Sequence, residues 1–125
     1  MGSGRSAAFA DALQHLEQAR DVDGFVESMF AGGVELRRPE TDQVEHGHDG
    51  ARRFWQQYVD QFEQIRSEFT RVVEADTGVL EWTSSGRLRT GAEISYRGVS
   101  LLDVDADGRV TRFATYYDTA AFSTP

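Results

Sequence analysis

Apolar residues near the start of the chain recur with the spacing of an amphipathic helix. Phe9, Leu13 and Leu16 lie at positions i, i+4 and i+7, so they form one stripe on a helix that we expect over residues 6–20. Asp21 follows directly, and an aspartate at this point is typical of the N-cap of a further helix. The pattern therefore predicts two consecutive helices.

The second helix is expected to be short and to bury Phe25 and Met29. Gly32 and Gly33 come shortly afterwards. Glycine is common directly after a helix, because it adopts the left-handed backbone conformation without strain. We therefore expect this glycine pair to end the helix.

A two-residue alternation then replaces the helical spacing. It predicts a strand over residues 34–38 that ends at Pro39. Val34, Leu36 and Arg38 share one face of this strand, because successive side chains of a strand point to opposite sides. The face that carries the two apolar residues is the inward one, so the Arg38 side chain is expected to point inward as well.

The next segment predicts a weak strand over residues 43–46 and a third helix over residues 51–64. His48 and Asp49 are the candidate caps of this helix. Its apolar stripe consists of Ala51, Trp55, Tyr58 and Phe62.

The remainder of the chain is rich in Val, Phe, Thr, Tyr and Leu and is interrupted by turn residues. We expect four strands in it, over residues 68–74, 79–88, 93–104 and 110–117. Asp107-Gly108, between the last two, is a strong hairpin signal. Helices that precede a run of hairpin-connected strands predict the α+β class, in which the helices cover a mostly antiparallel sheet.

The length of 125 residues corresponds to one domain, which we place at residues 6–125 after a flexible tail of residues 1–5. No apolar stretch approaches the roughly 20 residues of a membrane span, so no membrane partner and a cytoplasmic location are expected. The formal net charge of -8 argues against nucleic acid as a partner, because binding to phosphates usually requires a basic surface.

Two missing residue types narrow the chemistry. The chain has no Cys, which excludes disulfides, thiolate metal sites and cysteine nucleophiles. It also has no Lys, so a Schiff-base mechanism is excluded and all 13 basic residues are Arg. Lysine-free, Arg- and Ala-rich composition indicates a GC-rich bacterial genome.

Several short motifs, in this order and spacing, resemble the nuclear transport factor 2-like superfamily and within it the SnoaL-like proteins, which include polyketide cyclases and ketosteroid isomerases. The motifs lie at residues 19–24, 29–39, 50–55, 107–110 and 116–118. The resemblance implies a cone-shaped barrel, made of a curved, mostly antiparallel sheet with three N-terminal helices. It also implies a homodimer and a small apolar or aromatic ligand inside the cone.

The residues that ketosteroid isomerases use are absent at the matching positions. Their carboxylate base would precede Pro39, and this chain has Arg38 there. Their two oxyanion donors match Leu13 and a position near Ser100. The epoxide hydrolases of the superfamily use an Arg-x-Asp motif and an Asn, and the chain has neither. The resemblance therefore implies the fold but neither of these two reactions.

An inward-pointing Arg38 requires a partner, since burying an unpaired charge is costly. One interpretation is a structural ion pair with Asp118, Glu40 or Glu45. The other is an anchor for a carboxylate, enolate or phenolate of a ligand, for which the planar and always charged guanidinium is suited.

Asp118 follows the last strand, where related cyclases keep an acid or base, so the resemblance implies that it moves a proton. The alternative is an acidic cap or ion-pair partner at the end of the strand. Strand alternation places Asp118 on the opposite face from Thr115 and Tyr117, so it would point into the cone only if a bulge intervenes.

His46 and His48 have a spacing that two ligands of a metal could share. No third ligand is evident and a glycine separates them, so we expect no metal and no cofactor. His46 is instead a candidate acid or base at the edge of the pocket, and the alternative is an ordinary loop residue. Residues 103–108 resemble half of a calcium loop but are interpreted as a hairpin turn.

Aromatic side chains are the candidate pocket wall for a flat polycyclic or terpenoid ligand, or else part of the core: Trp55, Tyr58, Trp82, Tyr96 and Tyr117. The first functional hypothesis is a SnoaL-like small-molecule enzyme that performs cofactor-independent acid–base chemistry, namely cyclisation, isomerisation or hydration of a polyketide or terpenoid substrate. The alternative is a non-catalytic ligand-binding or dimerisation module of the same fold.

Overall fold

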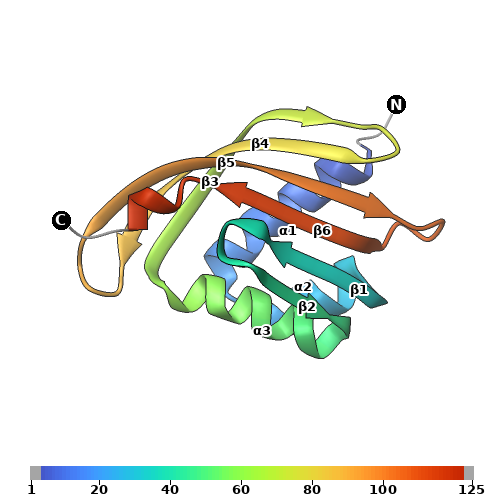
Figure 1. Cartoon of the computed structure of the whole chain (residues 1–125), viewed down its shortest axis with the longest axis horizontal. Helices are drawn as coiled ribbons and strands as arrows, with labels where there is room; N and C mark the ends of the chain where they lie inside the picture. The colour runs from blue at the N-terminus through green and yellow to red at the C-terminus, as the bar shows by residue number, and fades with distance from the viewer. Residues whose placement is uncertain (1–3, 123–125) are drawn as a thin grey trace.

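Three helices lie against one face of a curved sheet of six strands in the computed structural model, which describes residues 4–122 (Figure 1). Most of the expected tail, residues 1–3, lies outside the described residues. The helices are α1 (Arg5–Ala19), α2 (Val22–Met29) and α3 (Gly47–Asp60). The strands are β1 (Phe30–Arg38), β2 (Gln43–His46), β3 (Phe62–Val73), β4 (Gly78–Leu88), β5 (Glu93–Val104) and β6 (Val110–Tyr117). Two short 3₁₀ turns complete the chain, η1 (Pro39–Thr41) and η2 (Thr119–Phe122).

The sheet has the order β2-β1-β6-β5-β4-β3. All neighbours are antiparallel except β1 and β6, which run parallel (Figure 1). The α+β class, the curved sheet and the three N-terminal helices are therefore confirmed. Within residues 4–122 the edge strands β2 and β3 do not pair with each other, so the cone remains open along one side.

The first two helices begin and end close to the expected residues. The Asp21 carboxylate caps α2 by accepting a hydrogen bond from the Gly24 amide at 3.0 Å, as predicted. The prediction that Gly32 and Gly33 end this helix is wrong. The chain turns into β1 at Phe30, whose side chain is fully buried, and the two glycines lie inside the strand where the β1–β6 register shifts.

The third helix begins and ends four residues earlier than expected. Gly47, with a φ of +73°, turns the chain out of β2 directly into the helix. At the other end, Phe62 belongs to β3 and pairs with Leu88 of β4. The Phe62 side chain, which continues the apolar stripe of the helix in the sequence, is therefore buried as part of a strand.

A dense group of aromatic rings fills the space between the helices and the β1–β6 part of the sheet. The Phe9 ring lies 5.4 Å from Phe113, and the Trp55 ring lies 5.1 Å from Phe25 and 5.2 Å from Phe113, measured between centroids. Close-packed rings of this kind leave no space for a ligand at this end of the cone. Among the described residues, no helix is long and apolar enough to cross a membrane.

Candidate functional site

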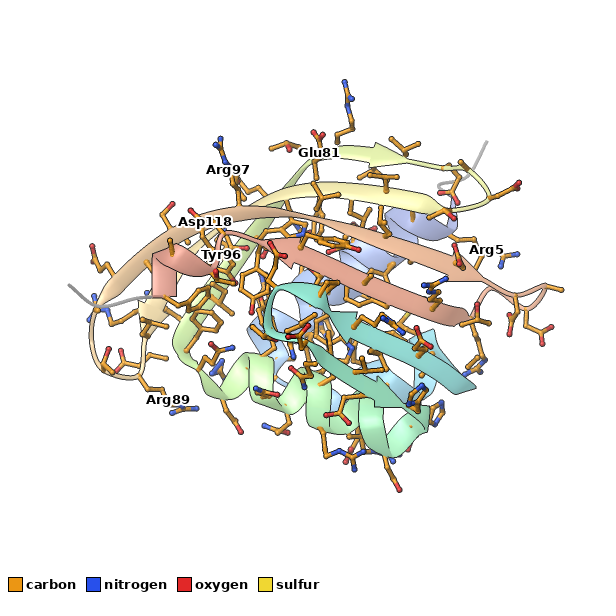
Figure 2. All side chains as sticks on the ribbon, viewed as in Figure 1. Arg5, Glu81, Arg89, Tyr96, Arg97 and Asp118 are labelled. Carbon is orange, nitrogen blue, oxygen red and sulfur yellow. The ribbon has the colours of Figure 1, made fainter. Side chains whose placement is uncertain are left out.

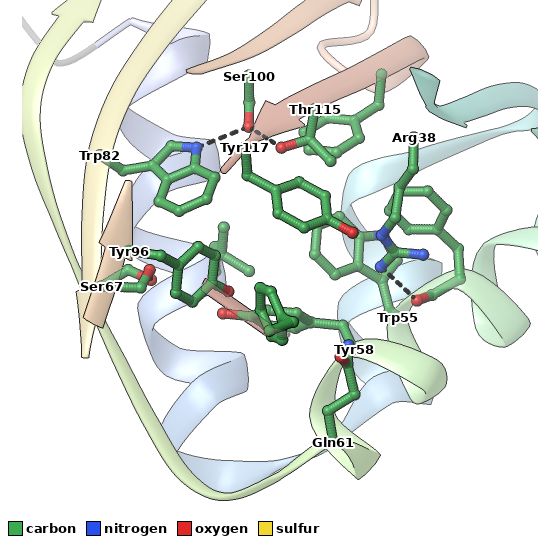
Figure 3. A pocket seen from close by; sticks show the side chains of 15 residues that line it. Arg38, Trp55, Tyr58, Gln61, Ser67, Trp82, Tyr96, Ser100, Thr115 and Tyr117 are labelled. Atoms are coloured by element: carbon green, nitrogen blue, oxygen red, sulfur yellow. Dashed lines mark hydrogen bonds between the residues drawn. The ribbon is translucent and has the colours of Figure 1, made fainter. Parts of the chain in front are cut away.

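A cavity of about 50 Å³ lies at the other end of the cone, between α1, α3 and the inner face of strands β3 to β6 (Figure 3). Since a buried water needs about 10–15 Å³ of such space, the cavity has room for a few waters, and a ligand of ring size requires the aromatic wall to move apart. The five aromatic residues singled out from the sequence, and Arg38 with them, all line it. Besides Arg38 and Gln61, its polar lining includes the hydroxyl groups of Ser67, Ser84, Ser100 and Thr115.

Arg38 points into this cavity from the end of β1, and its residue is only 6% exposed. One guanidinium nitrogen donates to Gln43 Oε1 at 2.8 Å and another to the Phe54 carbonyl at 3.0 Å. The guanidinium carbon also lies 3.6 Å from the centroid of the Phe54 ring, which is a cation–π contact. Burial lowers the pKa of Arg38, and the neighbouring phenols and Glu45 act in the opposite direction.

The expected ion pair of Arg38 is not formed. Among residues 4–122, no carboxylate forms an ion pair with this guanidinium, and Glu45 pairs with Arg53 at 3.1 Å instead. The Tyr117 phenol points toward the guanidinium (Figure 3). The cavity therefore contains a buried cation whose partners are all neutral, and this arrangement suits an anionic group of a ligand.

Asp118 is not among the residues that line the cavity. It lies just past the end of β6, near Arg97 of β5 (Figure 2). Its carboxylate is exposed and accepts a hydrogen bond from the Ala120 amide at 3.1 Å, while its own amide donates to the Arg97 carbonyl. No bulge interrupts β6 near Tyr117, so the alternation of the strand points Tyr117 inward and Asp118 outward. Asp118 thus caps the η2 turn.

His46 is exposed on the outer side of the β1–β2 hairpin, where its Nε2 lies 3.7 Å from Glu35 Oε1. The Nε2 of His48 lies 2.8 Å from the Phe30 carbonyl. The two imidazoles therefore have separate partners. The described part of the chain contains no group of three or more side chains placed to hold a metal ion.

Glu17, on α1, is a buried acid that the sequence analysis did not single out. Its carboxylate accepts three hydrogen bonds: from the Ser67 amide at 2.8 Å, from the Ser67 hydroxyl at 2.6 Å and from the Tyr58 hydroxyl at 2.6 Å. Burial raises the pKa of Glu17, and these hydrogen bonds act in the opposite direction. A signal was present in the sequence, because Glu17 lies four residues after Leu13 on the apolar stripe of the helix.

Ser100, on β5, lines the cavity and is buried. Here its hydroxyl accepts a hydrogen bond from Trp82 Nε1 at 3.0 Å and lies 2.9 Å from the Thr115 hydroxyl (Figure 3). It therefore orients the Trp82 ring in the wall. The indole N–H of Trp55 is buried and makes no hydrogen bond with any described residue, so the cavity wall keeps one unused donor.

These elements define the α+β cone of the nuclear transport factor 2-like proteins, here with a cavity beneath the curved sheet. The chain belongs to the SnoaL-like domain family, whose model matches residues 7–113. No curated protein matches the chain in sequence.

Solved structures with the same fold hold quite different small molecules. TerC, co-crystallised with polyporic acid, is 22% identical with a TM-score of 0.79, over 95% of both chains. RV0760c from Mycobacterium tuberculosis, in complex with estradiol-17beta-hemisuccinate, is 14% identical with a TM-score of 0.78, over 95% of this chain and 98% of that one. A protein with a ketosteroid isomerase-like fold from Catenulispora acidiphila, in complex with trimethylamine, is 13% identical with a TM-score of 0.80, over 94% and 97%. At these identities the likeness shows the fold alone.

Proposed function

We propose that this protein binds a flat aromatic or polycyclic small molecule that carries an acidic oxygen, and that it performs cofactor-independent acid–base chemistry on it. Cyclisation, isomerisation and hydration are the reactions of this class. The single observation that carries the proposal is the buried Arg38 guanidinium, which has only neutral partners and lines an aromatic cavity.

The shape of the ligand follows from the cavity walls. Trp82 and Tyr96 meet edge to face with centroids 5.4 Å apart, and Tyr96 and Tyr117 lie 6.0 Å apart. Rings set at these angles offer flat faces and polarised edges to a planar ligand. The hydroxyl groups of the polar lining would orient the ligand and would not contribute much to affinity.

The acidic oxygen of the ligand would lie at Arg38. A guanidinium forms short, charge-assisted hydrogen bonds with carboxylates, phenolates and enolates. An enolate or phenolate that develops during proton transfer would be stabilised at the same place, which is how a fixed charge accelerates a reaction. The aromatic ligands of TerC and RV0760c are consistent with this choice of ligand class.

A second candidate function is binding without turnover. It is favoured by one observation: among the described residues that line the cavity, none is a carboxylate or an imidazole. Transport or protection of a ligand would need the aromatic wall and Arg38 only.

The experiment uses polyporic acid and its O-methylated, uncharged derivative as probes. Quenching of Trp55 and Trp82 fluorescence would report binding. We expect the acid to bind more tightly than the ether. Arg38→Gln should lower the affinity for the acid by about tenfold or more, as expected for a charged hydrogen bond of roughly 1.5–3 kcal/mol. Arg37→Gln is the matched control, because Arg37 directly precedes Arg38 on the same strand and is exposed on the other face.

Equal affinity for the acid and the ether, or an Arg38 variant that binds like the control, would count against this proposal. Catalysis is then separated from binding in deuterated water. The probe for this step is 2-hydroxy-1,4-naphthoquinone, which carries a hydrogen on the carbon next to its acidic oxygen. If the protein moves protons, mass spectrometry will detect exchange of that hydrogen. If it only binds, exchange will proceed at the rate found without protein.

A further inference from the structure

We propose that Glu17 is the proton acceptor and donor of the cavity and that it exchanges protons with the ligand through the Tyr58 hydroxyl. This inference rests on the proposed function. Glu17 itself does not line the cavity, but its hydrogen-bond partners Tyr58 and Ser67 do. The missing acid–base group of the site is therefore present one hydrogen bond behind the wall.

Two hydrogen-bonded routes connect Glu17 with the cavity. The first is direct, because the Tyr58 hydroxyl lies 2.6 Å from Glu17 Oε2. The second runs through the Ser67 hydroxyl, which lies 2.6 Å from the same oxygen and 2.5 Å from the Ser84 hydroxyl. The Tyr58 and Tyr96 phenols approach each other in the cavity (Figure 3). A proton released by a ligand thus has a short path to the carboxylate.

The hydrogen bonds identify the form of Glu17 that the site is built for. All three groups in contact with the carboxylate are donors, and three donors suit the ionised form. No described Arg or His forms an ion pair with Glu17. A buried carboxylate without a counter-charge holds a proton more tightly than an exposed one does, because burial raises its pKa.

The titratable surroundings of Glu17 are few. Tyr58 from α3 and Tyr96 from β5 face it from the cavity side, and burial raises the pKa of both phenols, so both stay protonated. On the solvent side, Glu17 borders a surface groove between α1 and the start of β3. Three charged residues border the same groove: Arg20, Glu63 and Arg66. None of these three is among the causes of the raised pKa of Glu17. Among these groups Glu17 is therefore the acid whose pKa is raised by burial while it remains hydrogen-bonded to a cavity-lining phenol.

Arg38 and Glu17 carry opposite charges, and neither forms an ion pair. Arg38 is a buried cation that forms no ion pair, since Glu45 acts on it only from beyond ion-pair distance, and Glu17 is a buried acid that forms no ion pair with any described residue. A neutral acid that binds in the cavity can relieve both. Its proton would neutralise Glu17, and its conjugate base would pair with Arg38.

The proton-transfer step balances without any co-reactant. The O–H or C–H bond of the ligand breaks as its proton moves to the Tyr58 oxygen. At the same time the Tyr58 O–H bond breaks and its proton moves to Glu17 Oε2. The negative charge of Glu17 is transferred to the ligand oxygen beside Arg38, and Tyr58 is neutral before and after. The reverse step returns the proton to the ligand. If the proton goes to a different atom from the one it left, the ligand has been isomerised.

A coloured acid tests this relay without knowledge of the substrate. We would use 4-nitrophenol, whose phenolate absorbs visible light, at a pH below its own pKa, where the free probe is colourless. With the wild-type protein we expect the phenolate band to appear on binding, without release of protons to an unbuffered solution. Difference infrared spectra should show a protonated carboxyl band at the same time, because Glu17 has received the proton.

Glu17→Gln should bind the probe in its neutral form, with loss of both the visible and the infrared band. Glu63→Gln is the matched control, since Glu63 is an exposed acid on the neighbouring strand. Tyr58→Phe is a second test that leaves Glu17 in place, and it should lose the same bands even if Glu17→Gln does not fold.

The outcomes separate the two proposals. If the probe binds as phenolate equally well to wild type, Glu17→Gln and Tyr58→Phe, the relay is overturned and the binding role of Arg38 stands. If Arg38→Gln alone abolishes the phenolate band, the relay is overturned in the same way. If the wild-type protein takes up no nitrophenol at all, both proposals fail.

Discussion

Phe54 holds Arg38 in two ways, with its ring under the guanidinium at 3.6 Å and with its main-chain carbonyl as acceptor at 3.0 Å. Both contacts come from one residue of α3, so the first strand and the third helix are joined by a charge that neither of them neutralises. The stability of the fold therefore does not depend on the charge of Arg38, because the groups around it can also pack against an apolar side chain.

Replacing Arg38 by Leu should therefore weaken ligand binding while leaving the fold intact. The substitution loses two hydrogen bonds but removes the desolvation cost of a buried charge, so we expect the free energy of unfolding to change by about 1 kcal/mol at most. Urea melts measure it. A loss of about 3–5 kcal/mol, the typical cost of breaking a buried ion pair, would instead show that a carboxylate depends on Arg38.

Arg38 and Asp118 should behave as independent residues. Their side chains lie on opposite faces of the sheet, and we expect the effects of Arg38→Leu and Asp118→Asn on stability to add within about 0.5 kcal/mol. Asn keeps the oxygen that caps η2, so Asp118→Asn should preserve both stability and any turnover. Loss of turnover in Asp118→Asn at unchanged stability would show that Asp118 takes part in the reaction. A double variant that is more stable than the sum of the two single effects predicts would show an ion pair.

The raised pKa of Glu17 gives the stability a defined pH dependence. The folded protein holds this proton more tightly than the unfolded chain does, whose Glu pKa is about 4.5. Between that value and the folded-state pKa the native state binds more protons, so the free energy of unfolding falls as the pH rises. Denaturant melts across this window should show a smaller fall, or none, in Glu17→Gln. Identical pH profiles for the two proteins would mean that the pKa of Glu17 is the same in both states.

We expect Phe122 to control access to the cavity, which it lines. Its ring packs on Tyr96 at 4.8 Å and on Tyr117 at 5.7 Å between centroids, and it is the last lining residue of the chain. Phe122→Ala should speed the association of 4-nitrophenol or of larger aromatic acids, as stopped-flow fluorescence would measure. Val44→Ala, an exposed apolar residue on β2, is the control. Unchanged association rates would place the entrance elsewhere.

We also expect two copies of the chain to associate through the outer face of the sheet. That face carries Tyr116, which is 40% exposed, next to half-buried Val99 and Leu101 on β5. Association would remove these side chains from water. Sedimentation equilibrium should give twice the chain mass of 14.0 kDa at micromolar concentration, and a value near 14.0 kDa would exclude the dimer.

The parts of the site that follow local rules could be predicted from the sequence. The two-residue alternation placed Arg38 inward with Val34 and Leu36, and all three are buried. The same rule assigned Asp118 to the face opposite Tyr117, which is where its side chain lies. Period and turn chemistry also fixed the bounds of β2, β5 and β6, because these strands begin and end at clear turn residues.

The parts that depend on distant partners could not be predicted. Glu17 meets Tyr58, 41 residues away, and Ser67, 50 residues away, and nothing local announces these contacts. The family position before Pro39 drew attention to Arg38, whereas no motif drew attention to Glu17. Gly32 and Gly33 were misinterpreted for a similar reason, because their role is set by the pairing of β1 with β6 from the other end of the chain.

This pairing also determines when the cavity can exist. The parallel partner of β1 is β6, which follows every other strand of the sheet in the sequence, so one edge of β1 stays unpaired until β6 joins the sheet. Arg38 stands on β1 and Tyr117 on β6, and the wall between them closes only when the sheet order is complete. A partly folded chain in which β6 is still unpaired therefore has no ligand site, and a ligand of this cavity would stabilise only the state in which the sheet is complete.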